Sequence, residues 1–148
     1  RARPELTPPG VPIHPASGPI VVAIEYRVLP QHAAEFVAAI NELGRVRRRN
    51  GARGWSVSQD IDATDLWIER FESPTWTDHL RWRTRPTESD FEVRKRIGRL
   101  IVGEKGHVRR FVGRPPGSEP IGPVPGHDRS VAVAGSADVE PRPPSSLP

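Results

Sequence analysis

The middle of the chain switches between stretches of strand period and stretches of helix period. Apolar residues occupy every second position from 20 to 28, which predicts a strand with one strongly apolar face. From 33 to 46 the apolar residues fall at helical spacing, which predicts an amphipathic helix. Pro30 is placed to begin this helix and Asn50–Gly51 to end it, so residues 20–51 form one strand and one helix.

A hairpin and further helices are predicted next. Short strands at 55–59 and 66–72 flank the turn-forming stretch 60–65, and a last strand is predicted at 108–112. Ser73–Pro74 suits the start of a second helix, as cap and first helical residue. The residues expected to face inward from the second and third helices are Trp76, Leu80, Val93, Ile97, Leu100 and Ile101, with Trp82 and Phe91 as further candidates.

This order of elements predicts an α+β domain of the ferredoxin-like βαββαβ class, with a four-stranded antiparallel sheet and helices on one face. The other sheet face is left open. The residues predicted for the open face are Ala23, Glu25 and Arg27, with some of Trp67, Glu69 and Phe71. A partly apolar open face is usually covered by a second copy, so a homodimer is predicted.

Proline and glycine divide the chain into three parts. Residues 1–18 are predicted to be a proline-rich linker, 19–113 the α+β domain, and 114–148 a disordered tail rich in proline and glycine. The chain contains no methionine and begins with Arg1. We therefore expect it to be a piece of a longer protein.

The charge distribution narrows the classes of partner. The net charge is +4, and residues 20–112 hold 17 Lys/Arg and 13 Asp/Glu. Because acids alternate with bases along most elements, no nucleic-acid partner is expected. The arginines between 45 and 53 could dock on an anionic membrane surface, but they better suit the negative end of a helix dipole and solvation, and both can hold. No stretch is long and apolar enough to span a bilayer, so the segment itself is expected to be soluble.

Three blocks of sequence resemble a known family. They are GPIVVAIEYR at 18–27, RRRNGA at 47–52 and ESPTWTDHLR at 72–81. Together they resemble the soluble C-terminal domain of bacterial major-facilitator exporters of the group described as transmembrane secretion effectors, related to enterobactin exporters. The resemblance covers roughly residues 18–116, and the third block departs from the family by two residues inserted before its tryptophan.

The resemblance implies a function in transport. The chain would be an accessory domain, for dimerisation or cargo sensing, at the cytoplasmic face of the cell membrane. Its partner there would be the upstream transmembrane domain of an exporter of drugs or siderophores. The domain is also similar to antibiotic-biosynthesis monooxygenases, which form dimeric α+β barrels. The alternative function is therefore a cofactor-independent monooxygenase acting on an aromatic small molecule, although a non-enzymatic role is favoured.

Four residues are candidates for a binding pocket, and none is predicted to be catalytic. They are His79, Trp76, Trp67 and Trp55. The resemblance puts His79 first, because a histidine commonly stands in this place in monooxygenase-like domains. The favoured interpretation of His79 is nevertheless an inert, hydrogen-bonded histidine at the boundary of helix and sheet. The tryptophans suit either a cavity for a flat aromatic substrate or the filling of a core and a dimer interface.

Acid–base and cofactor chemistry have weaker candidates. Glu25, Glu69 and Glu72 suit either acid–base pairs or, more simply, cross-strand pairing with Arg27 or Arg70.

Haem and metals are not expected. A haem-degrading relative needs a second histidine further along the second helix, where this chain has Arg83 and Arg85. No three metal ligands stand at workable spacing, so no metal or other cofactor is predicted.

Overall fold

The structure is a computed structural model that describes residues 8–83, 88–103 and 106–126, and the side chains of residues 82, 83 and 89 are not among those described. The chain forms two compact units. One consists of Arg1–Ile13 and Pro116–Pro148, where the Val124 N–H donates to the Gly10 carbonyl at 2.8 Å. The other, His14–Pro115, is the α+β domain. Much of the predicted tail and the Trp82 side chain lie outside the described residues.

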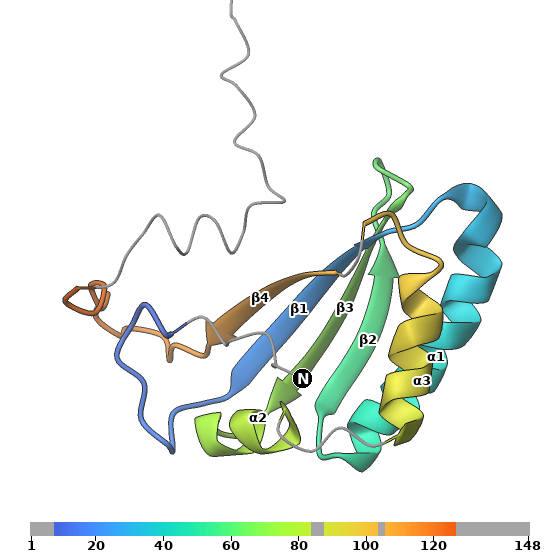
Figure 1. Cartoon of the computed structure of the whole chain (residues 1–148). Helices are drawn as coiled ribbons and strands as arrows, with labels where there is room; N and C mark the ends of the chain where they lie inside the picture. The colour runs from blue at the N-terminus through green and yellow to red at the C-terminus, as the bar shows by residue number, and fades with distance from the viewer. Residues whose placement is uncertain (1–7, 84–87, 104–105, 127–148) are drawn as a thin grey trace, which may run out of the picture. The chain divides into compact units, whose positions relative to one another are not determined.

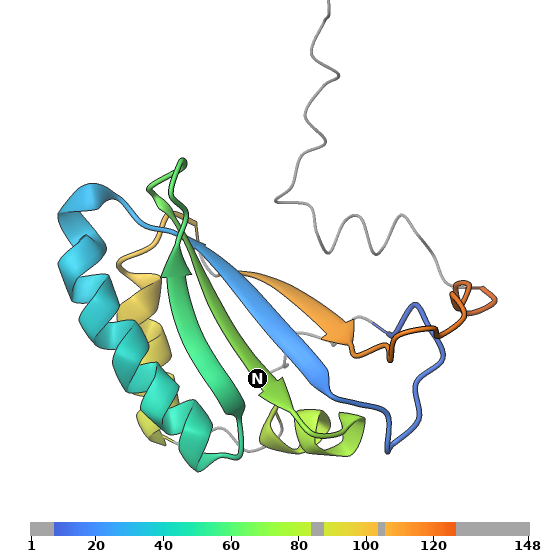
Figure 2. The ribbon, with the colours of Figure 1, turned by 180° about the vertical axis from the view of Figure 1, so that it is seen from behind.

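The α+β domain confirms the predicted fold class. Its sheet has the strand order β2-β3-β1-β4 with every pair antiparallel, and α1 and α3 run side by side on one side of it (Figures 1 and 2). The elements are β1 Ile20–Arg27, the short 3-10 helix η1 Pro30–His32, α1 Ala33–Arg49, β2 Arg53–Gln59, β3 Leu66–Ser73, α2 Trp76–Arg83, α3 Glu88–Gly98 and β4 His107–Val112.

The pairing of β1 with β3 decides which residues face the helices. Opposite residues of antiparallel strands share a face. The pairs on the helix-covered face are Val22 with Phe71, Ile24 with Glu69 and Tyr26 with Trp67. The prediction that some of Trp67, Glu69 and Phe71 lie on the open face is therefore wrong, because register cannot be deduced from the alternation within one strand. Ala23, Glu25 and Arg27 do lie on the open face, as predicted.

The second helix starts later than predicted. Ser73 ends β3 and is buried, so it does not cap α2. Thr75 does so instead: its Oγ1 accepts the Asp78 N–H at 3.1 Å and donates to the Asp78 carboxylate at 2.8 Å. Phe91 is 61% exposed, so it does not face inward from α3.

The segment that precedes β1 accepts hydrogen bonds from the N-terminus of α2. Trp76 N–H donates to the Ser17 carbonyl at 2.7 Å, and Thr77 N–H to the Pro15 carbonyl at 3.0 Å. A Cβ at Gly18 would lie 1.9 Å from the Pro74 carbonyl oxygen, so only glycine allows this approach. Because the first N–H groups of a helix have no partner within it, these bonds satisfy donors that α2 cannot satisfy itself.

The core lies between the sheet and the helices α1 and α3. Phe36, Ile40 and Leu43 of α1 are fully buried, each contributing on the order of 2 kcal/mol through removal of apolar surface from water. Gly44 lets Trp55 of β2 lie directly on the helix, since a Cβ there would come 2.6 Å from the indole ring. The α1 backbone and β2 are therefore in close contact at this point.

A buried ion pair lies within this core. Glu69 of β3 is 0% exposed and Arg47 of α1 is 5% exposed. The Arg47 Nε donates to Glu69 Oε2, and a second guanidinium nitrogen donates to Oε1 at 3.0 Å. Tyr26 Oη donates to Oε1 at 2.9 Å and Trp55 Nε1 to Oε2 at 2.8 Å. We name these four residues the Glu69 cluster.

The Glu69 cluster corrects two predictions. Glu69 was expected to pair across strands with Arg27 or Arg70, but its partner comes from α1. Arg47 was grouped with the cations that favour the end of a helix dipole, but it points into the core, where its Cζ lies 4.4 Å from the centre of the Phe71 ring.

The cluster also sets the charge of its members. Burial alone would lower the pKa of Arg47, but attraction to Glu69 and hydrogen bonding with it leave that pKa raised. Burial, followed by repulsion from the Glu69 carboxylate, raises the pKa of the Tyr26 hydroxyl above its ordinary value. The stable state is thus a charged pair with a neutral phenol.

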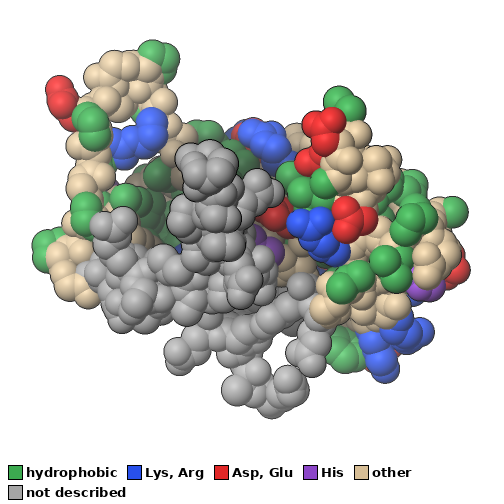
Figure 3. Space-filling model, turned by 90° about the horizontal axis from the view of Figure 1, so that it is seen from above, with side chains coloured by type: hydrophobic (Ala, Val, Ile, Leu, Met, Phe, Trp, Pro, Cys, Tyr) green, Lys and Arg blue, Asp and Glu red, His purple; other side chains and the backbone are tan. Residues whose placement is uncertain are grey.

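The open face of the sheet mixes apolar and charged groups. Its side chains include Val21, Ala23, Glu25 and Arg27 from β1, Leu66, Ile68, Arg70 and Glu72 from β3, and Arg109, Phe111 and the buried His107 from β4. Glu25 pairs with Arg109 at 3.3 Å, and Phe111 is 53% exposed. Seen from above, the molecule shows acidic and basic side chains next to one another on its surface (Figure 3).

The substitution Glu69→Leu tests the importance of the ion pair. It leaves the Arg47 charge buried with no carboxylate, so we expect the free energy of unfolding to fall by about 3–5 kcal/mol. Urea unfolding followed by circular dichroism measures the change.

The double variant Arg47→Met, Glu69→Leu is the control for charge. It removes both charges, so we expect it to be more stable than Glu69→Leu alone. A double variant that loses the sum of the two single losses would contradict coupling between Arg47 and Glu69.

Tyr26 predicts how stability depends on alkaline pH. Because the folded state raises its pKa above the unfolded value of about 10, folding stability is complete below that pH and falls as pH rises above it. Tyr26 is the sole tyrosine of the chain, so tyrosinate absorbance reports on it alone. We expect that absorbance to appear together with unfolding; tyrosinate formed in the folded protein near pH 10 would contradict the burial of Tyr26.

Candidate functional site

The four predicted pocket residues fall into two groups. Trp55 and Trp67 belong to the core beneath α1, where Trp55 donates to Glu69 and the Trp67 ring lies 5.6 Å from that of Phe36. Trp76 and His79 stand on α2. Trp55 and Trp67 therefore help to fill the core, which was one of the two alternatives for the tryptophans. Whether they also line a pocket stays a prediction.

The second group combines aromatic rings with a cation. His79 is 0% exposed, and its ring centre lies 5.2 Å from that of Trp76. Arg110 of β4 places its Cζ 5.4 Å from the Trp76 ring. Burial lowers the pKa of Arg110. This group lies between α2 and β4 and is held by packing and cation–π contact.

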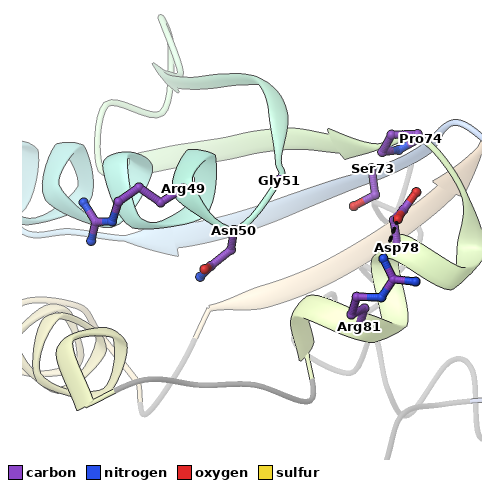
Figure 4. Close-up of a pocket in the computed structure, with 7 residues that line it drawn as sticks. All are labelled: Arg49, Asn50, Gly51, Ser73, Pro74, Asp78 and Arg81. Atoms are coloured by element: carbon purple, nitrogen blue, oxygen red, sulfur yellow. Dashed lines mark hydrogen bonds and ion pairs between the residues drawn. The ribbon is translucent and has the colours of Figure 1, made fainter.

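A cleft opens at a different place. It lies where α1 ends, beside the end of β3 and the start of α2, and has a volume of about 450 Å³. The residues that line it are Arg49, Asn50, Gly51, Ser73, Pro74, Asp78 and Arg81 (Figure 4). We name it the α1–α2 cleft. None of the four predicted pocket residues lines it, although Asp78 adjoins His79 in the sequence.

The lining of the α1–α2 cleft is polar and carries both signs of charge. Arg81 donates to Asp78 at 3.4 Å, and Thr75 holds the same carboxylate from the opposite side. Arg49 has no ion-pair partner among the described residues. Guanidinium, carboxylate, amide and hydroxyl groups in one opening suit the binding of a polar molecule.

Two of the three candidate carboxylates, Glu69 and Glu25, are held in ion pairs, and the third, Glu72, lies on the open face opposite Val21. Glu69 accepts hydrogen bonds from Arg47, Tyr26 and Trp55 in a sealed core, which leaves it no access to a substrate. Glu25 lies on the open face and pairs with Arg109. Both therefore hold the structure together.

Two residues of the Glu69 cluster could have been found from the sequence. Arg47 follows Ile40 and Leu43 at the spacing of the apolar stripe of α1, and Glu69 shares the phase of Phe71 on β3. A charge in the apolar phase of two different elements indicates a buried pair. The cleft gave no such signal, because its lining comes from three separate segments.

Metal sites and membrane spans are absent from the part of the chain that the structure describes. Within residues 8–83, 88–103 and 106–126, no three His, Asp or Glu side chains gather as metal ligands. Among the same residues, no helix combines the length and apolar character that a bilayer crossing requires.

Comparison with solved structures supports the fold. A candidate antibiotic biosynthesis monooxygenase from Caulobacter crescentus matches with a TM-score of 0.58 at 17% identity, over 67% of this chain and 92% of its own. A similar candidate from Bordetella bronchiseptica matches with a TM-score of 0.54 at 24% identity, over 64% of this chain and 95% of its own. Another from Nitrosomonas europaea matches with a TM-score of 0.56 at 14% identity, over 69% of this chain and 96% of its own. At these identities the likeness establishes the ferredoxin-like fold alone.

Comparison by sequence identifies the family. No curated protein matches the chain. The family model described as "Transmembrane secretion effector" matches residues 3–115, a stretch that includes the whole of the α+β domain. This chain belongs to the transmembrane secretion effector family.

Proposed function

We propose that this chain is an accessory domain of a membrane exporter of small molecules, such as drugs or siderophores. The domain would follow the membrane bundle of the exporter and lie at the cytoplasmic face. The observation that carries the proposal is the family match over 3–115, which coincides with a folded α+β domain that needs no membrane span of its own to bury its core.

The open sheet face supports a role in pairing two exporters. Apolar side chains of three adjoining strands, such as Val21, Ile68 and Phe111, lie on it without a covering helix. Covering such a surface removes apolar area from water, and a second copy supplies the same surface about a two-fold axis. The charged residues of the face, among them Glu25 and Arg109, can exchange partners across that axis.

The fold likeness favours one alternative, a monooxygenase acting on an aromatic small molecule. Such an enzyme needs a pocket that joins His79 with at least one tryptophan and admits a flat ring. Here His79 is 0% exposed and packs against Trp76, while Trp55 and Trp67 fill the core elsewhere. These contacts favour the accessory role over the enzymatic one.

The substitution Ile68→Lys tests pairing through the open face. A lysine placed there would put a charge into the proposed interface, so we expect the dimer to dissociate at least tenfold more readily. Sedimentation velocity over a range of concentrations measures this.

Ile61→Lys is the matched control. Ile61 lies in the β2–β3 hairpin and is 91% exposed, so the same chemical change should leave the dimer intact. A monomeric wild-type chain, or equal dissociation of both variants, would contradict the proposed interface.

The reading frame upstream of Arg1 tests the link to an exporter. We expect it to encode about a dozen apolar segments of roughly 20 residues each, the length that spans a bilayer as a helix. A frame without such segments would refute the accessory role in transport.

A further inference from the structure

The last two turns of α1 carry three exposed arginines, Arg45, Arg48 and Arg49. Arg47 lies among them in the sequence but points into the core. Residues three and four apart are neighbours on the surface of a helix, so the three exposed guanidinium groups share one side of α1. The Arg49 side chain extends along the helix and away from α2 (Figure 4). We name these three residues the α1 arginines.

The α1 arginines form no ion pair with another described residue. No Asp or Glu occurs between Glu42 and Asp60 in the sequence. Glu88 and Glu92, the exposed acids of the neighbouring helix α3, form no ion pair with a described residue either. Like charges three and four residues apart repel one another and lower the stability of a helix. An anionic partner would remove this repulsion.

The helix dipole accounts for the α1 arginines only in part. The partial negative charge at the end of a helix acts within the last turn. Arg45 lies a full turn before the last residue of α1, outside that range. The carbonyl of Arg47 already accepts the Ala52 N–H at 3.0 Å, so part of the negative end is satisfied by the backbone. The three charges together therefore need another explanation.

The α1 arginines lie at the end of the domain where the chain enters. Gly18, which precedes β1, lies against α2, because a Cβ at Gly18 would come 1.9 Å from the Pro74 carbonyl oxygen. Pro74 and Arg49 in turn line the same cleft. Figure 1 likewise shows α1 ending at the end of the sheet where β1 begins. A membrane bundle joined to the chain before Gly18 would thus face the α1 arginines.

We propose that the α1 arginines dock the domain on the anionic lipid head groups of the membrane. A bilayer surface offers many phosphates in a plane, so the three cations bind it without converging on one group. Attachment to a membrane bundle raises the effective concentration of the domain at the surface, so a weak contact suffices. The proposal rests on the proposed function, which supplies the membrane at this end of the domain.

A nucleic acid is a less suitable partner for the same surface. Proteins that bind single strands combine cations with aromatic rings on which the bases stack. The Arg48 Cζ lies 5.1 Å from the centre of the Trp55 ring. That ring packs on α1 at Gly44 and donates to Glu69 at 2.8 Å, so it is engaged in the core.

Co-sedimentation of the 148-residue chain with lipid vesicles tests the proposal. We expect binding at low salt to vesicles of equal parts phosphatidylglycerol and phosphatidylcholine, and none to pure phosphatidylcholine. Raising the ionic strength to about 1 M, where the Debye length is about 3 Å, should release the chain. Arg45→Gln should weaken binding about fivefold, and the triple change of Arg45, Arg48 and Arg49 to Gln about a hundredfold. Because these side chains are exposed, the triple variant should keep the circular dichroism of the wild type.

Arg99→Gln is the matched control. Arg99 is exposed and forms no ion pair with a described residue. It follows α3, close to Val102, whose N–H donates to the Arg27 carbonyl at the far end of β1. Because a charge further from the lipid than a Debye length is screened, the variant should keep binding within about twofold.

Three results would overturn the proposal. They are no binding to the anionic vesicles at low salt, equal weakening by Arg45→Gln and Arg99→Gln, and tighter binding to duplex DNA than to vesicles at the same phosphate concentration. Each is measured on this chain alone. Failure would therefore leave untouched the link to an exporter, which the upstream reading frame tests.

Discussion

The ion pair between Glu69 and Arg47 is the constraint on which the domain depends. Both charges are removed from water. Unless hydrogen bonds compensate each of them, the free energy of unfolding falls by several kcal/mol. Glu69 meets this demand with donors from α1, β1 and β2 at once. The carboxylate therefore fixes the position of the helix over three strands, and the surrounding rings of Tyr26, Trp55 and Phe71 pack around it.

This arrangement separates stability from binding. The helix-covered face is filled by the Glu69 cluster and by rings such as Phe36 and Trp67. The surfaces available to partners include the open sheet face and the α1–α2 cleft. The first surface is partly apolar, and the second is lined by polar and charged groups.

The fold was predictable because it rests on local periodicity. Alternation in β1 and the stripe of α1 each specify an element and its apolar side. Register was not predictable, because it depends on the pairing of distant strands; this is why Glu69 and Phe71 were expected on the wrong face. The sequence predicts Ser73 as the cap of α2 in place of Thr75, because both side chains carry a hydroxyl. Only the position at which β3 ends distinguishes the two. The cleft is lined by three segments that come together only on folding, so no single stretch of sequence predicts it.

The carbonyls of Pro15 and Ser17 complete the first turn of α2, the helix that also supplies Asp78 and Arg81. A pulling force on the chain before Pro15 would move these carbonyls away from the N–H groups of Trp76 and Thr77. The first turn of α2 would then be less stable. Because thermodynamic coupling is reciprocal, an interaction that stabilises the helix at Asp78 and Arg81 also stabilises the bound position of the segment at Pro15 and Ser17. The two effects are equal in free energy. The segment that enters at Pro15 and the first turn of α2 therefore stabilise each other.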